Sequence, residues 1–271
     1  MAERRIARRD LRATDDEPWA DGWVEHFRAN RESHAALEAR TDWTGESTLS
    51  RRDQAALVRS LQRFELGEGG DGAHLLRKAE RRASPARVEA LRLLIAEEQA
   101  HSALFARGLH HFGAPRLGSH WSDAAFTRLR RALGLRTELM LFLIAESVAM
   151  PYFVALSRFD GDDVVRTIGL RIALDERHHI AFQVDQLRHG FQELPGGLRV
   201  AVFAASWVIA VGAATVVAVD HGPALRASGM SRRRFWRSAL GSFRDAVAAA
   251  LWPTSGVGGS RPATRTPMSA Q

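Results

Sequence analysis

Two short stretches of this chain repeat one pattern of acidic and imidazole side chains. The first is Glu-Glu-Gln-Ala-His at residues 97–101, and the second is Asp-Glu-Arg-His-His at residues 175–179. In each stretch an acid precedes a Glu, and a His follows that Glu three residues later. A lone Glu also stands 30 residues before the central Glu of each copy, as Glu68 in the first case and Glu146 in the second. This doubling predicts a metal site far more strongly than either copy alone.

The geometry of an α-helix explains the spacing. Residues three apart lie on one face of a helix, so Glu98 and His101 can bind the same ion, and the same holds for Glu176 and His179. An upstream helix that runs antiparallel offers one further Glu at the same height. Bundles of four helices that hold two iron or manganese ions use this ligand set. The sequence therefore predicts two metal ions, with iron favoured and manganese or a mixed pair as alternatives, bound by Glu68, Glu98, His101, Glu146, Glu176 and His179.

The acids that precede the two ligand carboxylates have a predicted supporting role. A metal-bound imidazole usually donates its other N–H to a carboxylate or carbonyl, which fixes the tautomer. We expect Asp175 to accept this hydrogen bond from His101, and Glu97 to accept it from His179. The alternative for each acid is an ordinary ion pair with an arginine of a neighbouring helix.

Four glycines surround the first upstream Glu, between residues 67 and 72. A Gly inside a helix costs about 1 kcal/mol relative to Ala, so in one interpretation the helix ends here and a loop follows. In the other interpretation, the small residues let helices approach closely or leave room beside the metals. The equal 30-residue spacing favours this second interpretation. It also favours Glu68 over Glu65, which lies one turn earlier and is the alternative ligand.

The rest of the chain predicts helix after helix, because no run alternates apolar and polar residues as a half-buried strand does. Ser50, with Asp53 three residues later, is a variant of the capping box. Ser84 is a second cap, followed by a proline at the first helical position. The expected fold is all-α: an N-terminal arm with a short helix (1–49), a di-metal four-helix bundle (50–192), a hydrophobic C-terminal helix with a following helix (193–252) and a disordered tail (253–271).

Composition narrows the classes of function. The 271 residues are 45% hydrophobic and 25% charged, which is ordinary for a globular protein. There is no Cys, which excludes disulfides and iron–sulfur clusters within the chain. The net charge is +7, but no aromatic residues interleave with the arginine clusters, so we do not expect a nucleic-acid partner. The first residues lack the apolar region of a secretory signal, and we expect a cytoplasmic protein.

The ligand set resembles that of the ferritin-like di-iron carboxylate superfamily, over about residues 50–192. Subfamily-specific positions differ. Phe105 stands where the small subunit of ribonucleotide reductase has a radical tyrosine, and Ile172 stands where the best-known N-oxygenases have an extra His. Ala149 and Met150 stand where multicomponent monooxygenases and desaturases carry a Thr. The resemblance therefore implies the fold and the metal site without selecting a reaction.

Three functions are compatible with this resemblance. The leading hypothesis is an oxygen-activating di-iron oxidoreductase, an oxidase or oxygenase, that oxidises a small organic substrate in an apolar space between helices. A separate electron donor is expected, because no flavin or nicotinamide motif is visible. The alternatives are a ferritin- or rubrerythrin-like protein that handles iron or peroxide, and a membrane-attached enzyme like the quinone hydroxylases. A helical protein without a working site is the remaining possibility.

The segment from Val200 to Val219 contains no charged residue and is long enough to span a membrane. Arginines follow at residues 226 and 232–234, as on a cytoplasmic side. A soluble protein can also use such a helix as an element buried on all sides, or at a dimer interface. We expect a buried helix in a homodimer. Association with the inner face of a membrane through residues 200–219 is the alternative.

Overall fold

The computed structural model describes residues 17–121, 125, 127–128, 134–191 and 194–252. Every regular element in these residues is a helix, which confirms the all-α fold class. The helices are α1 (Pro18–Glu38), α2 (Arg51–Glu68), α3 (Ala73–Glu80), α4 (Pro85–His111), α6 (Leu135–Leu156), α7 (Asp163–Phe191), α8 (Gly196–Asp220), α9 (Gly222–Ala227) and α10 (Arg232–Leu251). The tail predicted to be disordered, residues 253–271, lies outside the described residues.

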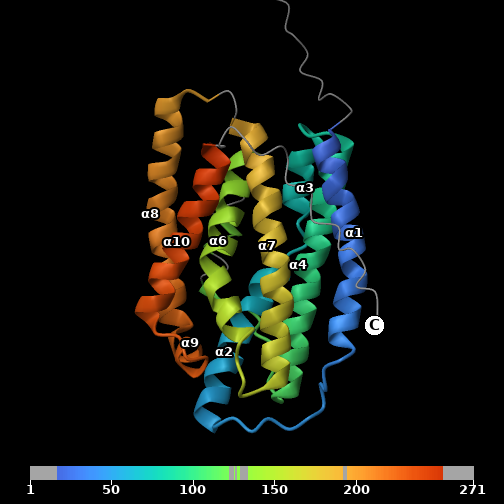
Figure 1. Ribbon diagram of the computed structural model, residues 1–271, viewed down its shortest axis with the longest axis vertical. Coiled ribbons are helices and arrows are strands. Elements are labelled where there is room, and N and C mark those ends of the chain that lie inside the picture. The colour runs from blue at the N-terminus through green and yellow to red at the C-terminus, as the bar shows by residue number, and fades with distance from the viewer. Residues whose placement is uncertain (1–16, 122–124, 126, 129–133, 192–193, 253–271) are drawn as a thin grey trace, which may run out of the picture.

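The long helices run side by side along the longest axis of the molecule, with α1 at one edge and α8 at the opposite edge (Figure 1). α2 packs on α4, α6 packs on α7, and α4 meets α7. These are the four helices that carry the repeated pattern of Glu and His. α10 packs against α6, α7 and α8, and α1 covers α4 and α7.

Helix starts follow the capping signals of the sequence. Ser50 Oγ accepts a hydrogen bond of 3.1 Å from the backbone N–H of Asp53 at the start of α2. Ser84 Oγ accepts from the backbone N–H of Arg87 at the start of α4, and Pro85 is the first helical residue. Each hydroxyl satisfies one backbone donor that has no partner within its helix. The two predicted starts are therefore confirmed.

The glycine-rich segment ends α2. The helix stops at Glu68, and Gly72 has a left-handed φ of 60° before α3 begins. The prediction placed the glycines beside the site instead of at a simple helix end. It is only half right, because the glycines both end α2 and lie beside the site. Gly67, Gly70 and Gly72 line the same cavity as Glu68. A Cβ on Gly72 would lie 2.3 Å from Ile95 Cδ1, so this close approach requires a glycine.

The N-terminal helix is longer than the short helix predicted for residues 1–49. α1 has 21 residues and buries Trp23 and Phe27. Both aromatic rings contact Phe182 of α7, at centroid distances of 5.6 and 5.5 Å. The sequence has the hydrophobic spacing for this helix, but its polar composition concealed the length.

Residues 200–219 were predicted to be buried, either within the protein or at a dimer interface, and the single chain does not bury them. α6 and α8 are both long and apolar enough to cross a membrane, by length and composition only. The apolar window of α6 is 72% buried, as in a core helix, whereas that of α8 is only 17% buried. α8 therefore lies on the outside of the molecule, as Figure 1 also shows. Whether a second copy covers it in a homodimer stays a prediction.

Candidate metal centre

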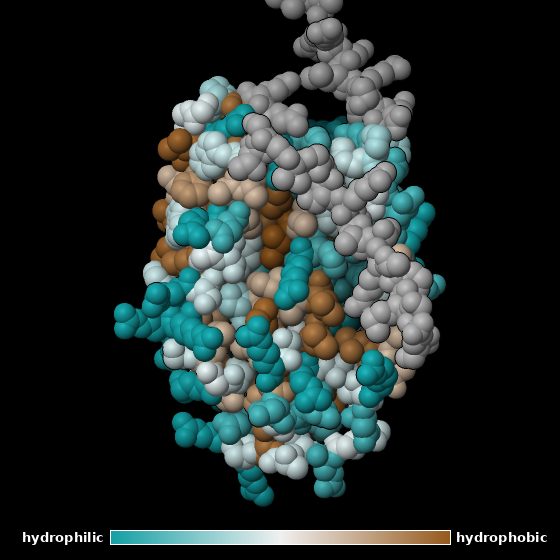
Figure 2. All heavy atoms as spheres, in the orientation of Figure 1, coloured by the Kyte–Doolittle hydropathy of each residue, from teal (hydrophilic) through white to brown (hydrophobic). Residues whose placement is uncertain are grey.

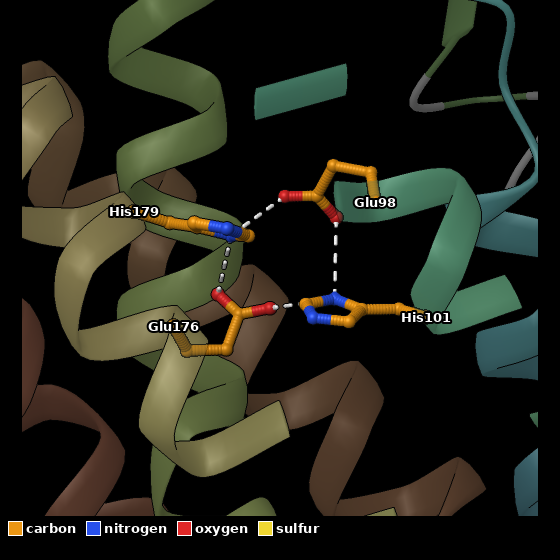
Figure 3. A group of neighbouring side chains, drawn as sticks. All are labelled: Glu98, His101, Glu176 and His179. Atoms are coloured by element: carbon orange, nitrogen blue, oxygen red, sulfur yellow. Dashed lines mark ion pairs between the residues drawn. The ribbon is translucent and has the colours of Figure 1, made fainter. Parts of the chain in front are cut away.

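Glu98 and His101 of α4 face Glu176 and His179 of α7 (Figure 3). One potential ligand atom from each residue lies within 4.8 Å of those of the other three. His179 Nδ1 is 2.9 Å from Glu98 Oε1 and 3.9 Å from Glu176 Oε2. His101 Nδ1 is 3.8 Å from Glu98 Oε2 and 3.7 Å from Glu176 Oε1. Each imidazole thus faces the carboxylates of both helices, and this buried cluster could hold a metal ion.

The outward nitrogen of each imidazole is held by an acid of the opposite helix. His101 Nε2 lies 2.8 Å from Asp175 Oδ2, and His179 Nε2 lies 2.9 Å from Glu97 Oε2. These are the two pairings expected from the sequence. With Nε2 held outward, each Nδ1 faces the cluster, which is the orientation that a metal ligand needs. Burial lowers the pKa of His101 to about 3, so this imidazole is neutral. Burial opposes the charge of His179 as well, but the charge of Glu98 and hydrogen bonds to Glu97 and Glu98 outweigh it and raise the pKa of His179 well above its ordinary value, so a metal ion at Nδ1 would take the place of a proton.

A second set of buried and half-buried polar residues supports the two acids. Asn30 Nδ2 donates hydrogen bonds of 3.0 Å to both Glu97 Oε1 and Asp175 Oδ1. His34 Nε2 donates to Asp175 Oδ1 at 2.8 Å, while its Nδ1 accepts from Arg171. Arg171 also forms a buried ion pair with Asp175. Burial, and then the charge of Arg171, lower the pKa of His34 to about 4, so this imidazole is neutral.

Glu68 and Glu146 complete a group of four carboxylates that line one cavity with Glu98 and Glu176. Burial first, and then the negative charge of Glu98, raise the pKa of Glu68 well above its ordinary value, and the two side chains share a hydrogen bond. The same two causes raise the pKa of Glu146 to about 8, although Gln183 donates a hydrogen bond to its Oε1. Burial, and then the charge of Glu146, raise the pKa of Glu176. The group therefore needs protons or cations to compensate its charge.

Glu65, the alternative to Glu68, points elsewhere. Its side chain is buried and accepts a hydrogen bond of 2.7 Å from Arg116 Nε. Ser102 Oγ donates to Glu65 Oε1 at 3.3 Å and to its backbone oxygen at 3.0 Å. Glu68, and not Glu65, is thus the residue of α2 that lies with the other three carboxylates.

The cavity beside the four carboxylates has a volume of about 470 Å³. Its remaining walls are mostly apolar and come mainly from α2, α6 and α8, with Phe64, Phe142, Phe153, Ile209, Val216 and Val217 among them. Arg63, Asp220 and His221 are its other polar lining residues. A mostly apolar space next to a polar cluster is the usual form of a small-molecule site.

Four polar residues of the site carried no recognised signal in the sequence. Gln183 stands four residues after His179, and Arg171 stands four residues before Asp175, so helical spacing on α7 could have indicated both. Asn30 and His34 lie one turn apart on α1, but nothing in the sequence relates α1 to the repeated pattern. Their role follows only from the packing of α1 across α4 and α7.

In comparisons with known proteins, no family model and no curated protein sequence matches this chain.

Proposed function

We propose that this protein is a two-metal oxidoreductase that activates O₂ and oxidises a small organic molecule in the cavity beside the cluster. In this proposal α2, α4, α6 and α7 form a ferritin-like four-helix bundle that carries the ligands, and the other helices are additions to it. The resemblance of the ligand spacing to the di-iron carboxylate proteins supports the reaction class. The observation that carries the proposal is the orientation of two buried imidazoles toward the carboxylates of Glu98 and Glu176, with Glu68 and Glu146 lining the same cavity.

The residues present fit a metal site. Three buried atoms of the cluster have no hydrogen-bond partner among the described residues: His101 Nδ1, Glu146 Oε2 and Glu176 Oε2. His179 Nδ1 and Glu98 Oε1 face each other beside them at 2.9 Å. Leaving such atoms unpaired costs about 1–3 kcal/mol each, and they converge on one place. Mixed carboxylate and imidazole donors suit iron and manganese. Cations held there would both pair these atoms and compensate the four carboxylates.

Two such ions, when bound, would supply the binding and reduction of O₂. The chain itself supplies the rest. Asp175 and Glu97 hold the Nε2 protons of the two imidazoles and keep each Nδ1 directed inward. Gln183 orients the Glu146 carboxylate through its amide N–H. The apolar walls of the cavity exclude water and present an organic molecule to the carboxylate end of the site.

The cavity favours oxidation of an organic substrate over iron storage. Iron oxidation needs a route for hydrated ions, whereas this space is walled mainly by aromatic and aliphatic side chains. Electrons would come from a separate donor protein, because the sequence carries no recognisable flavin or nicotinamide motif.

Oxidation of Fe(II) by the purified metal-free protein tests this function. Fe(II) would be added anaerobically in increasing ratio, followed by O₂, with the oxidised iron measured by absorbance. The proposal expects rapid oxidation that saturates at about two ions per chain. Glu176→Gln should abolish the rapid phase, whereas Glu65→Gln, a buried carboxylate outside the cluster, should retain it. Continued rapid oxidation of many ions per chain would instead identify an iron-storing protein, and no rapid phase in the unaltered chain would exclude both functions.

A further inference from the structure

α8 presents an apolar face to the outside along its length. Val200 and Val219 are each 57% exposed, and Val208 is 75% exposed. At about 1.5 Å per residue, this helix of 25 residues is roughly 37 Å long. Monomeric soluble proteins rarely leave a contiguous apolar surface of this extent in contact with water. Figure 2 shows hydrophobic residues along the edge of the molecule where α8 lies in Figure 1.

The inner face of α8 packs against other helices of the protein. Its buried residues are small: Ser206, Ala210, Ala214 and Ala218. They allow α8 to approach α6 and α10 closely, and Trp207 packs edge-on against Phe243 of α10 at 5.2 Å. A helix bound along one side to two others cannot be surrounded by lipid. α8 therefore fits a position parallel to a membrane surface rather than across a membrane.

Basic and aromatic residues flank the exposed face at its C-terminal end. Trp236 Nε1 of α10 donates a hydrogen bond of 3.2 Å to Thr215 Oγ1, which places the indole beside α8. Arg233, Arg234 and Arg237 are exposed and line one hollow on the surface. Tryptophan is enriched at membrane interfaces, and arginine is attracted to anionic headgroups. The combination of an apolar strip, an indole and three arginines is complementary to an anionic bilayer surface.

The opposite side of the same helix segment borders the cavity of the candidate metal centre. Ile209, Ala213, Val216 and Val217 of α8 are all lining residues. Trp121, which is 62% exposed, lines the cavity as well. An apolar molecule dissolved beside α8 is thus one helix away from the four carboxylates.

We propose that the outer face of α8, with Trp236 and the arginines of α10, docks this protein on an anionic lipid bilayer. The helix lies flat in the interface with its valines among the upper acyl chains. The cavity behind it then takes up a lipid-soluble substrate from the bilayer. This choice of substrate rests on the proposed function, whereas the docking does not.

Flotation with lipid vesicles tests the docking. The unaltered chain is expected to float with vesicles of phosphatidylglycerol and phosphatidylcholine, and to bind vesicles of phosphatidylcholine alone much more weakly. Val208→Asp should abolish binding, because it places a charge among the acyl chains without removing a buried contact. Its control is Ala36→Asp, on the exposed surface of α1 at the opposite edge of the molecule.

Charge reversal at two arginines tests the electrostatic part. Each basic residue near an anionic surface contributes about 1 kcal/mol, so Arg233→Glu with Arg234→Glu should weaken binding by at least ~25-fold. The control, Arg31→Glu with Arg40→Glu on and just after α1, keeps the same net charge as this variant. Equally weakened vesicle binding in the two double variants would show a non-specific effect of charge. It would contradict the assignment of α8 and α10 as the docking surface.

Two further results would overturn the proposal. The unaltered chain could fail to bind anionic vesicles. It could also be a dimer that Val208→Asp converts to a monomer without any vesicle binding, in which case a second copy covers α8. Metal content is measured on the same variants, and all of them should retain the metal of the unaltered chain. A failure of the docking proposal is thereby distinguished from a failure of the proposed function.

Discussion

The two halves of the candidate metal centre share one sequence pattern but are held in different ways. In the half formed by α6 and α7, Glu146 lies in the middle of its helix and Glu176 is only 1% exposed. In the half formed by α2 and α4, Glu68 is the last residue of its helix, and the side chain of Glu98 is 18% exposed. Equal spacing in the sequence has therefore produced one enclosed half and one half that opens on the glycine-rich segment and the cavity.

The supporting acids show the same asymmetry. Asp175 of α7 contacts His101, Asn30, His34 and Arg171. Glu97 of α4 has only His179 and Asn30 as hydrogen-bond partners among the described residues. The comparison indicates that α7, with its buried acid Asp175, is the more firmly held part of the cluster, whereas the end of α2 at Glu68 is the part most able to adjust.

Removing the charge of the better-connected acid should have the largest effect. Asp175→Asn leaves Arg171, which is buried, without its ionic partner, and breaking such a pair costs about 3–5 kcal/mol. Glu97→Gln leaves no buried guanidinium behind and should cost about 1–3 kcal/mol. Urea unfolding of the metal-free variants measures the difference. Equal losses would show that the two halves are supported alike.

The open half can be tested at its upstream Glu. Glu68→Ala should lower the bound metal by about one ion per chain, because it removes a ligand that no neighbour replaces. Glu65→Ala should leave the metal content unchanged, since that side chain is bound to Arg116 and Ser102. Metal analysis after dialysis distinguishes the two. Loss of metal in the Glu65 variant with retention in the Glu68 variant contradicts the placement of Glu68.

The glycine-rich segment offers a matched pair of smaller changes. Gly72→Ala would force an alanine into the left-handed backbone region and would bring its methyl group onto Ile95. We therefore expect a loss of about 1–3 kcal/mol in the free energy of unfolding. Gly67→Ala meets no atom within 4 Å and lies within α2, so it should be neutral or stabilise by up to ~1 kcal/mol. Thermal unfolding of the two variants decides whether the turn after Glu68 constrains this half. Comparable losses would show that it does not.

A buried set of hydrogen-bonded side chains also connects the two halves, away from the candidate metal ligands, and it includes a histidine with a shifted pKa. Ser60 Oγ of α2 lies 2.5 Å from Tyr152 Oη of α6 and 2.7 Å from His221 Nδ1. Burial, and then the charges of Arg63 and His120, lower the pKa of His221 from 6.5 to about 3. Below pH 6.5, therefore, His221 binds a proton in the unfolded chain but stays neutral in the folded chain.

This group should make stability fall with acid. The stabilising contribution of neutral His221 is complete above pH 6.5 and is lost toward pH 3, at up to about 1.4 kcal/mol per pH unit. His221→Asn, which keeps a hydrogen-bonding group near Ser60, should reduce the pH slope of the free energy of unfolding between pH 6.5 and 4. An unchanged slope means that other histidines with lowered pKa values, such as His26 and His34, account for it.

Local patterns predicted much of this structure. The spacing of Glu98, His101, Glu176 and His179 is set by one turn of helix, so periodicity was enough to place them together. The caps at Ser50 and Ser84 are likewise local. The positions of the two caps needed no knowledge of the rest of the fold. The pairing of Asp175 with His101 joins two helices, and it was predicted from the way metal-bound imidazoles are usually held.

Other features depend on contacts between distant segments. Asn30 and His34 support the site only because α1 lies across α4 and α7, and no spacing in the sequence reports that packing. α6 and α8 have similar mean hydropathy, yet one is enclosed and the other lies at the edge. The hydrophobicity of a helix shows that it can be buried. It does not show whether neighbouring helices are present to cover it.

A direct titration of the metal-free protein with Fe(II) or Mn(II) under anaerobic conditions tests the central claim of a two-metal site. The unaltered chain should bind about two ions. His101→Ala and His179→Ala should each lose most of this binding, while His110→Ala, an exposed histidine on the same helix as His101, should retain it. Glu98→Gln serves as a variant of nearly equal volume if either alanine variant fails to fold. Binding of about two ions by all of these variants, or of none by the unaltered chain, would contradict the account.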